Sequence, residues 1–120
     1  MLHWSDAPRE HDCVYHKRGD CPVGADALVV DVFVTPSIVK TRPIAISIGR
    51  YRHNKPMRTE QWQLAGVGDL SPAARELPLL LGKVGVRAEH IASLSTEIES
   101  FLVKESAALH DALSSIGPST

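Results

Sequence analysis

Residues able to bind a metal gather early in the sequence, where His11, Cys13, His16 and Cys21 fall within eleven positions. Thiolate sulfur and imidazole nitrogen are the ligands that a tetrahedral zinc ion prefers, and a metal would order a segment with few apolar residues. The spacing lacks the paired C-x-x-C of common zinc sites. We therefore favour the alternative, an arm with scattered polar side chains, and expect no other cofactor.

A second group of candidate residues is basic. Between Val32 and Thr59 there are six Lys or Arg residues and no Asp or Glu, whereas residues 60–120 hold eight acids and four bases. Such a cluster attracts phosphates without sequence preference, and an aromatic ring beside it is able to stack on a base. We expect a surface for nucleic acid or for an acidic protein. Its candidate residues are Lys40, Arg42, Arg50, Tyr51, Arg52, Lys55 and Arg58.

Motifs for catalysis are missing from the sequence. It contains no glycine-rich phosphate loop, no G-x-S-x-G and no H-E-x-x-H. His11-Asp12 and His110-Asp111 are adjacent pairs, and neighbouring residues on a helix point in different directions. Cys13 near His16 has the composition of an activated thiol, but an irregular arm is a poor support for catalytic geometry. We expect a protein that is not an enzyme.

The elements that position these residues begin with strands. Residues 1–24 show no sustained period and predict an irregular N-terminal arm, and residues 25–120 predict a single α+β domain. Alternating β-branched residues predict a strand at 27–35, with two more at 44–52 and 58–65. The fold class is thus a three-stranded antiparallel sheet, followed by helices at about 72–84 and 87–115 that pack on one face.

The two later strands predict a hairpin around residues 53–57. Placing Ile48 opposite Trp62 puts Ile46 opposite Leu64 and Arg50 opposite Glu60. This register gathers the apolar side chains on one face and leaves Tyr51, Gln61 and Gln63 on the other, and a slip of one residue would reverse the faces. The apolar side chains of Ile46, Ile48, Trp62 and Leu64 are expected to be buried against Leu77, Leu80, Leu81 and Ile91.

The helical half offers a helix-turn-helix pattern around Gly85, with Leu80, Val84, Val86 and Leu94 at its apolar positions. The motif would present Arg87, Glu89, His90 and Ser93 to a DNA groove. Because this half of the chain is acidic, we favour an ordinary helical hairpin. Thr96 and Glu99 form a capping-box pattern, so a helix break near Ser95 is an alternative to one long helix.

The hairpin and the helix after it resemble the positive-coactivator family, which binds single-stranded DNA. The resemblance rests on Tyr51, Asn54-Lys55-Pro56, Trp62 and Glu76-Leu77-Pro78, about 35 residues in all. The further strand and loop that the family has between Trp62 and the helix are absent here. We therefore assign no site residue from it.

Together these patterns favour a non-catalytic, cytoplasmic, DNA- or RNA-binding protein that uses a basic β-hairpin. The alternative is a protein–protein interaction module, such as an inhibitor, adaptor or assembly factor, whose hairpin binds an acidic partner. A membrane partner is not expected, since no run approaches the roughly 18 apolar residues that span a bilayer. A continuous helix over 87–115 would overhang the sheet with Leu109, Leu113 and Ile116 uncovered, which predicts a homodimer through the C-terminal helix.

Overall fold

The architecture comes from a computed structural model, which describes residues 2–9, 12–36 and 41–116. In this part of the chain, strands come first and helices follow. The strands are β1 (His3–Asp6), β2 (Tyr15–Val23), β3 (Asp26–Val34), β4 (Ile44–Arg52) and β5 (Lys55–Leu64). A short 3₁₀ helix, η1 (Val67–Asp69), leads into α1 (Leu70–Ala74), α2 (Leu77–Lys83), α3 (Ala88–Lys104) and α4 (Ser106–Ile116).

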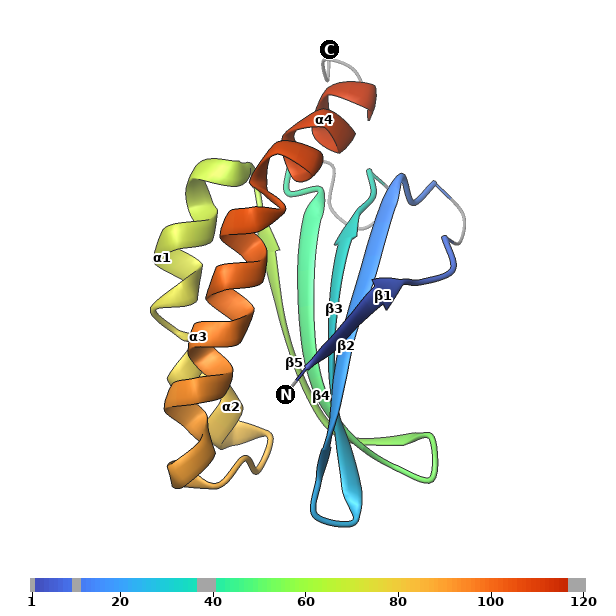
Figure 1. Ribbon diagram of the computed structural model, residues 1–120. Coiled ribbons are helices and arrows are strands. Elements are labelled where there is room, and N and C mark those ends of the chain that lie inside the picture. The colour runs from blue at the N-terminus through green and yellow to red at the C-terminus, as the bar shows by residue number, and fades with distance from the viewer. Residues whose placement is uncertain (1, 10–11, 37–40, 117–120) are drawn as a thin grey trace.

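The strands form one antiparallel sheet in which each strand pairs with the next along the chain (Figure 1). Tight turns make this order possible. Gly24 has a φ of 65° between β2 and β3, and His53 and Asn54 have φ values of 51° and 64° between β4 and β5. Two successive residues at positive φ form a type I′ turn, whose twist matches that of antiparallel strands.

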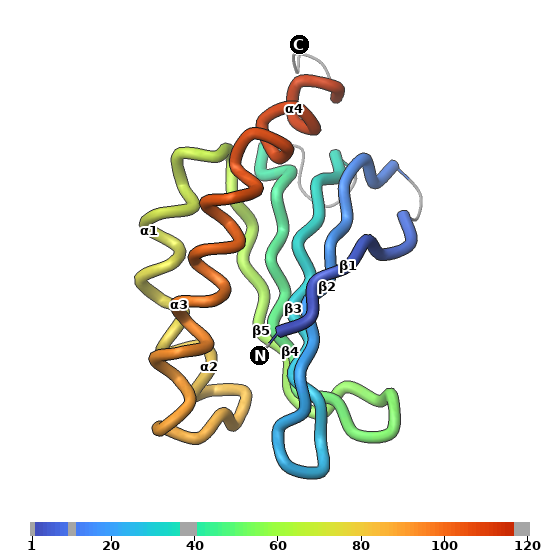
Figure 2. Tube along the Cα trace, in the orientation of Figure 1, coloured from blue at the N-terminus to red at the C-terminus, as the bar shows by residue number. Residues whose placement is uncertain are grey.

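The helices lie on one side of the sheet, so the opposite face is free of helices (Figures 1 and 2). The helix-covered face carries the apolar side chains of β3 and β4, and its core members have no exposed surface. They are Leu28, Val30, Val32, Val34, Ile44, Ile46 and Ile48. Leu77, Leu81, Ile98 and Leu109 of the helices are equally buried opposite them.

The α+β class and the antiparallel sheet are confirmed, but the sheet has five strands where three were predicted. Residues 1–24, predicted as an irregular arm, contribute β1 and β2. Their strand pattern was hidden because the inward positions of β2 include Lys17 and Gly19, which pair with Val32 and Val30 of β3. An inward lysine and an inward glycine give no apolar alternation in the sequence.

The predicted faces of the β4–β5 hairpin are correct, but its register is shifted by two residues. Trp62 and Leu64 are half-buried, whereas burial was predicted. Ile46 pairs with Trp62, and Ile48 pairs with Glu60. The prediction assumed a five-residue loop, whereas the type I′ turn continues both strands to the tip and a bulge beside Tyr51 absorbs the extra residue. The predicted Arg50–Glu60 pair is therefore absent, since Arg50 faces Arg58.

The predicted helix over 87–115 is divided at Glu105, not near Ser95. Thr96 lies within α3 and its hydroxyl donates to the carbonyl of Ala92, which is a contact inside a helix and not a cap. Glu105 instead accepts a 2.6 Å hydrogen bond from the Tyr15 hydroxyl, which anchors the junction of α3 and α4 to β2.

Within the described residues, no helix is long and apolar enough to cross a membrane.

An aromatic stack fastens β1 to the helical layer. The Trp4 ring lies parallel to that of Phe101 in α3, with centroids 3.6 Å apart and an interplanar angle of 4°. The other face of the indole rests on Gly19 of β2, where an added Cβ would lie 2.8 Å from the ring. Glycine is therefore required at this position because the indole occupies the space of a side chain.

We predict that Gly19→Ala lowers the free energy of unfolding by about 1–3 kcal/mol, because the new methyl group must displace the Trp4 ring from its stack. Chemical denaturation followed by circular dichroism measures the change. Gly68→Ala is the matched control, because nothing lies within 4 Å of its Cβ position, and it should not destabilise the protein. Equal stability of the two variants would contradict the close approach of Trp4.

Candidate functional site on the open face of the sheet

A buried carboxylate joins the tips of two hairpins. The Asp26 side chain, 1% exposed, accepts hydrogen bonds from Arg50 Nε and from Arg52 Nε, the latter at 2.7 Å. These hydrogen bonds, that of Arg52 first, together with the positive charges, lower the pKa of Asp26 to about 2. A buried charge is stable only with such partners, so the β2–β3 and β4–β5 hairpins are held in fixed relation.

Two arginines of the hairpin also reach the helical layer. Arg50 Nη1 donates to the Gly85 carbonyl at 2.7 Å, and Arg58 Nη1 donates to the Lys83 carbonyl at 2.8 Å. Carbonyl groups at the end of a helix lack partners within the helix. The arginines therefore satisfy the C-terminal end of α2 and the turn after it, while they fix the hairpin against the helices.

The residues predicted to form one basic surface therefore have different roles. Arg50 and Arg58 bind within the protein, and Arg52, with its side chain 53% exposed, is shared with Asp26. Lys55 is exposed beside the turn. Arg42 precedes β4 and lies at its far end, roughly 25–30 Å from the tip at about 3.3 Å per residue. Lys40 lies outside the described residues.

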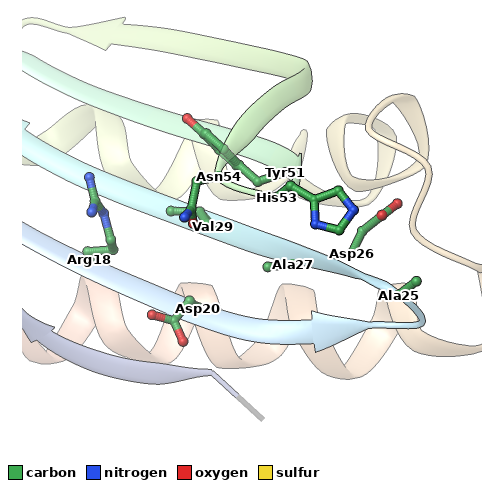
Figure 3. Close-up of a pocket in the computed structure, with 9 residues that line it drawn as sticks. All are labelled: Arg18, Asp20, Ala25, Asp26, Ala27, Val29, Tyr51, His53 and Asn54. Atoms are coloured by element: carbon green, nitrogen blue, oxygen red, sulfur yellow. The ribbon is translucent and has the colours of Figure 1, made fainter.

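The structure instead brings Tyr51 into a hollow on the open face, with a volume of about 530 Å³. In Figure 3, Tyr51 and Asn54 lie on one side of β3, and Arg18 and Asp20 lie on the other. Small apolar side chains line the hollow between them, those of Ala27 and Val29 from β3 and that of Ala25 from the turn before it. The hollow thus has an apolar centre, one aromatic wall and polar groups at its rim.

Local backbone features orient the side chains that line the hollow. The bulge between Arg50 and Tyr51 increases the twist at the end of the hairpin. The turn that follows brings His53 and Asn54 to the same hollow. Asparagine is among the residues that best tolerate positive φ, so Asn54 serves both the turn and the rim. Tyr51 was predicted as a site residue, and its position on the open face is confirmed by the register of the hairpin.

A polar network lies next to the hollow on the same face. Asp31 Oδ1 is 2.8 Å from both Arg18 Nε and His16 Nε2, and the His16 and Asp31 side chains are less than a tenth exposed. The Arg18–Asp31 hydrogen bond raises the pKa of Arg18, so this rim guanidinium stays charged. Asp31 thereby fixes Arg18 at the edge of the hollow.

His16 has no nitrogen free for chemistry. Nδ1 lies 2.7 Å from the Pro8 carbonyl, Nε2 faces Asp31, and the ring packs on Phe33 with centroids 4.4 Å apart. The two contacts fix the orientation of the imidazole ring in the sheet.

Of the four residues considered for zinc, the three that the structure describes are not brought together. His16 is on the open face, whereas Cys21 is on the helix-covered face, where burial raises the pKa of its thiol. Cys13 donates to the Tyr15 carbonyl, and His11 lies outside the described residues. Across residues 2–9, 12–36 and 41–116, no three potential metal-binding side chains gather.

The helix-turn-helix pattern corresponds to α2, the turn at Gly85, whose φ is 89°, and α3. Of the apolar residues of the motif, Leu80, Val84, Val86 and Leu94 are buried, and Ile91, also expected at an apolar position, is half-buried. The residues that the motif would present to DNA are exposed on α3 or just before it, namely Arg87, Glu89, His90 and Ser93. Arg87 and His90 approach Glu89 at 3.6 and 3.7 Å, so an acid lies within this group.

Sequence reasoning missed Arg18, Asp26 and Asp31. An available signal was the pair of acids within the otherwise apolar strand from Asp26 to Val34, because buried carboxylates in a strand require cationic partners. Arg18 was not recognised because β2 was not recognised. The contacts of Arg50 and Arg58 with the helical layer were also missed, since nothing in the sequence indicates them.

The depressed pKa of Asp26 predicts a pH dependence. A carboxylate with a lower pKa in the folded state stabilises the fold above its unfolded pKa of 3.8, and this contribution is lost as the pH falls toward 2. The difference in unfolding free energy between the wild type and Asp26→Asn should therefore be constant above about pH 5 and shrink toward pH 2. Denaturation at several pH values measures it.

Asp20→Asn provides the control, because Asp20 is an exposed carboxylate on the neighbouring strand. Its substitution should change stability little across the same range. If the Asp26→Asn difference stayed constant down to pH 2, the ion pair with Arg50 and Arg52 would not be what stabilises Asp26.

The hollow beside Tyr51, with Arg18, His53 and Asn54 around it, is the candidate functional site. It lies on the face of the sheet that the helices leave open, and its walls come from β2, β3 and the β4–β5 hairpin. Comparison of the chain with protein-family models, curated proteins and solved structures found no match.

Proposed function

We propose that this chain is a non-catalytic nucleic-acid-binding protein whose open sheet face receives a base of a single strand beside Tyr51. The observation that carries the proposal is the hollow itself. Its aromatic wall offers a surface for stacking, its centre at Ala27 and Val29 is apolar, and Asn54 offers an amide to a base edge. Stacking on an exposed aromatic side chain of a sheet is a general way to bind unpaired bases.

The shape of the hollow favours single strands. A base in a duplex is stacked on both faces and paired along one edge, so it enters a pocket only after it has been unstacked and unpaired, at a cost of a few kcal/mol. A volume of about 530 Å³ accommodates a base but not a double helix. We therefore expect single-stranded DNA or RNA to bind more tightly than a duplex of the same sequence.

Phosphate contacts would come from the few cations that border this face. Arg52 and Lys55 are exposed at the hairpin tip, and the Arg18 side chain is 45% exposed at the rim. Each phosphate neutralised on a single strand contributes about −0.7 to the slope of log affinity against log salt. Three such contacts predict a slope of about −2, which is a modest salt dependence.

Labelled oligonucleotides at low and moderate salt test the proposal by fluorescence anisotropy. We predict that Tyr51→Ala weakens single-strand binding by about 1–3 kcal/mol, the usual value for one stacked base. Tyr51→Phe keeps the ring and should retain most of the affinity. Gln61→Ala, on the same face but outside the hollow, is the control and should bind like the wild type.

Two results would count against this function. One is the absence of binding at low salt, and the other is equal binding of the wild type and Tyr51→Ala. A preference for duplex would instead favour a groove contact by exposed residues of α3, such as Arg87, over the hollow.

A second function is favoured by the position of β5. In the described sheet this strand pairs only with β4, and its residues 55–59 are exposed. An edge strand offers unpaired backbone groups to an extended peptide, and Lys55 and Arg58 would attract an acidic one. The chain would then be an inhibitor, adaptor or assembly factor, and failure of every oligonucleotide to bind would leave this function ahead.

Assembly of two chains through the C-terminal helix also remains a proposal, although the uncovered apolar stripe that predicted it is absent. Leu109 is fully buried, and Leu113 and Ile116 pack against the same core, so no apolar stripe overhangs the sheet. The apolar surface left on α3 is Val103, which is 69% exposed just before the junction with α4. A homodimer through this region would bury Val103 against its counterpart.

Light scattering at micromolar concentrations tests the homodimer. We predict twice the chain mass for the intact protein and the mass of one chain for Val103→Lys, because a buried lysine at the interface would lose its hydration. Leu79→Lys, another exposed apolar position but on α2, should leave the dimer intact. A single-chain mass for the intact protein rules the homodimer out.

A further inference from the structure

A second cavity lies on the helix-covered side of the sheet, at the same end as the hairpin tips. It has a volume of about 500 Å³ and separates the β2–β3 turn from the first half of α3. This is within the range of about 300–1,000 Å³ that holds small molecules in proteins. Its walls come from β2, β4, the α2–α3 turn and α3, so only the folded chain forms it.

The interior of this cavity is apolar on one side. Val23 at the turn, Leu94 of α3 and the Cys21 thiol line it, and Cys21 and Leu94 are almost completely buried. Burial raises the pKa of Cys21, so the thiol is neutral near pH 7 and contributes as a small apolar group. An apolar portion of a ligand would gain by leaving water here.

The other side of the cavity carries two arginines and a histidine. Arg50, Arg87 and His90 line it from three different elements. Arg50 is held in place by Asp26 and by the Gly85 carbonyl, and its Nη2 has no hydrogen-bond partner in the described part of the chain. An arginine fixed in this way loses little freedom when it binds an anion.

Three carboxylates lie near these groups, and each has a partner within the protein. Glu97, which also lines it, accepts the backbone N–H of Leu2 at 3.0 Å. Asp26 is bound by two arginines. Glu89 approaches Arg87 Nε and His90 Nε2 only at 3.6 and 3.7 Å, which exceeds hydrogen-bond length. Arg87 and His90 therefore have donors available for a ligand.

We infer that this cavity binds a small organic anion with an apolar body, such as a carboxylate with an alkyl chain. The carboxylate lies between Arg50 and Arg87, and the alkyl part lies against Leu94, Val23 and Cys21. The site is separate from the hollow beside Tyr51, because it opens on the opposite side of the sheet. The inference therefore does not rest on nucleic-acid binding.

Three ligands of one series test the inference by titration of the ¹⁵N-labelled protein in NMR. Octanoate has the charge and the apolar body, acetate has only the charge, and octylammonium has the body with the opposite charge. Octanoate should shift the amide signals of Cys21, Val23, Gly24 and residues 90–94. Acetate should require at least tenfold higher concentration, and octylammonium should leave these signals unchanged.

Arg87→Gln combined with His90→Gln should raise the dissociation constant of octanoate at least tenfold, because the groups that face the carboxylate are removed. Both substitutions keep polar side chains at exposed positions, so the variant should fold normally. Arg75→Gln, an exposed arginine at the end of α1, is the control and should bind octanoate like the wild type. Tyr51→Ala should also bind octanoate normally, which separates this site from the proposed function.

Cys21 supplies a second measurement. In a Cys13→Ser background it is the remaining cysteine of the chain. Bound octanoate should slow the reaction of Cys21 with a thiol reagent at least fivefold, whereas octylammonium should not. The inference is overturned if octanoate shifts none of these amides, if octylammonium binds there as tightly, or if the double variant keeps wild-type affinity.

Discussion

The Asp26 carboxylate is the constraint on which both cavities depend. It is buried at the start of β3, and it is stable there only because Arg50 and Arg52 of the next strand bind it. Arg50 extends the connection to Gly85, between α2 and α3. One charge thereby aligns two hairpins with the helical layer. On one side of the sheet this alignment places Tyr51 at its hollow, and on the other it places a guanidinium in the cavity beside α3.

A second buried carboxylate, that of Asp31, is stabilised by its partners in the same way. This carboxylate is shared between Arg18 and His16, and His16 reaches back to the Pro8 carbonyl before β2. Each buried group has a partner of the complementary type, as burial requires. Groups satisfied in this way position others and do little chemistry themselves. This arrangement suits a binding surface, in which a rigid sheet presents a small number of exposed rings and cations.

The sequence predicted those strands in which buried apolar residues alternate with more exposed ones. β3 and β4 were found because both bury β-branched residues on one face, and the face that carries Tyr51 followed from Ile46 and Ile48. β2 was not predicted because Gly19 and Lys17 occupy inward positions. The position of the break at Glu105 was not predicted, and the contact observed there is with the hydroxyl of Tyr15, ninety residues earlier. Partners this distant in sequence leave no local pattern, and the roles of Asp26 and Arg50 were missed for the same reason.

The order of elements has a consequence for biosynthesis. The sheet is complete in the chain by Leu64, but the residues that cover it, from Leu77 to Leu109, are synthesised afterwards. The pairs β2–β3 and β4–β5 are each joined by a tight turn, so these two hairpins close early and quickly, as local contacts allow. The nascent sheet then exposes Val30, Val32 and Ile46 to water until α3 and α4 leave the ribosome. A translational pause between α2 and α3 would lengthen that interval, and the uncovered sheet would be open to chaperones and to aggregation.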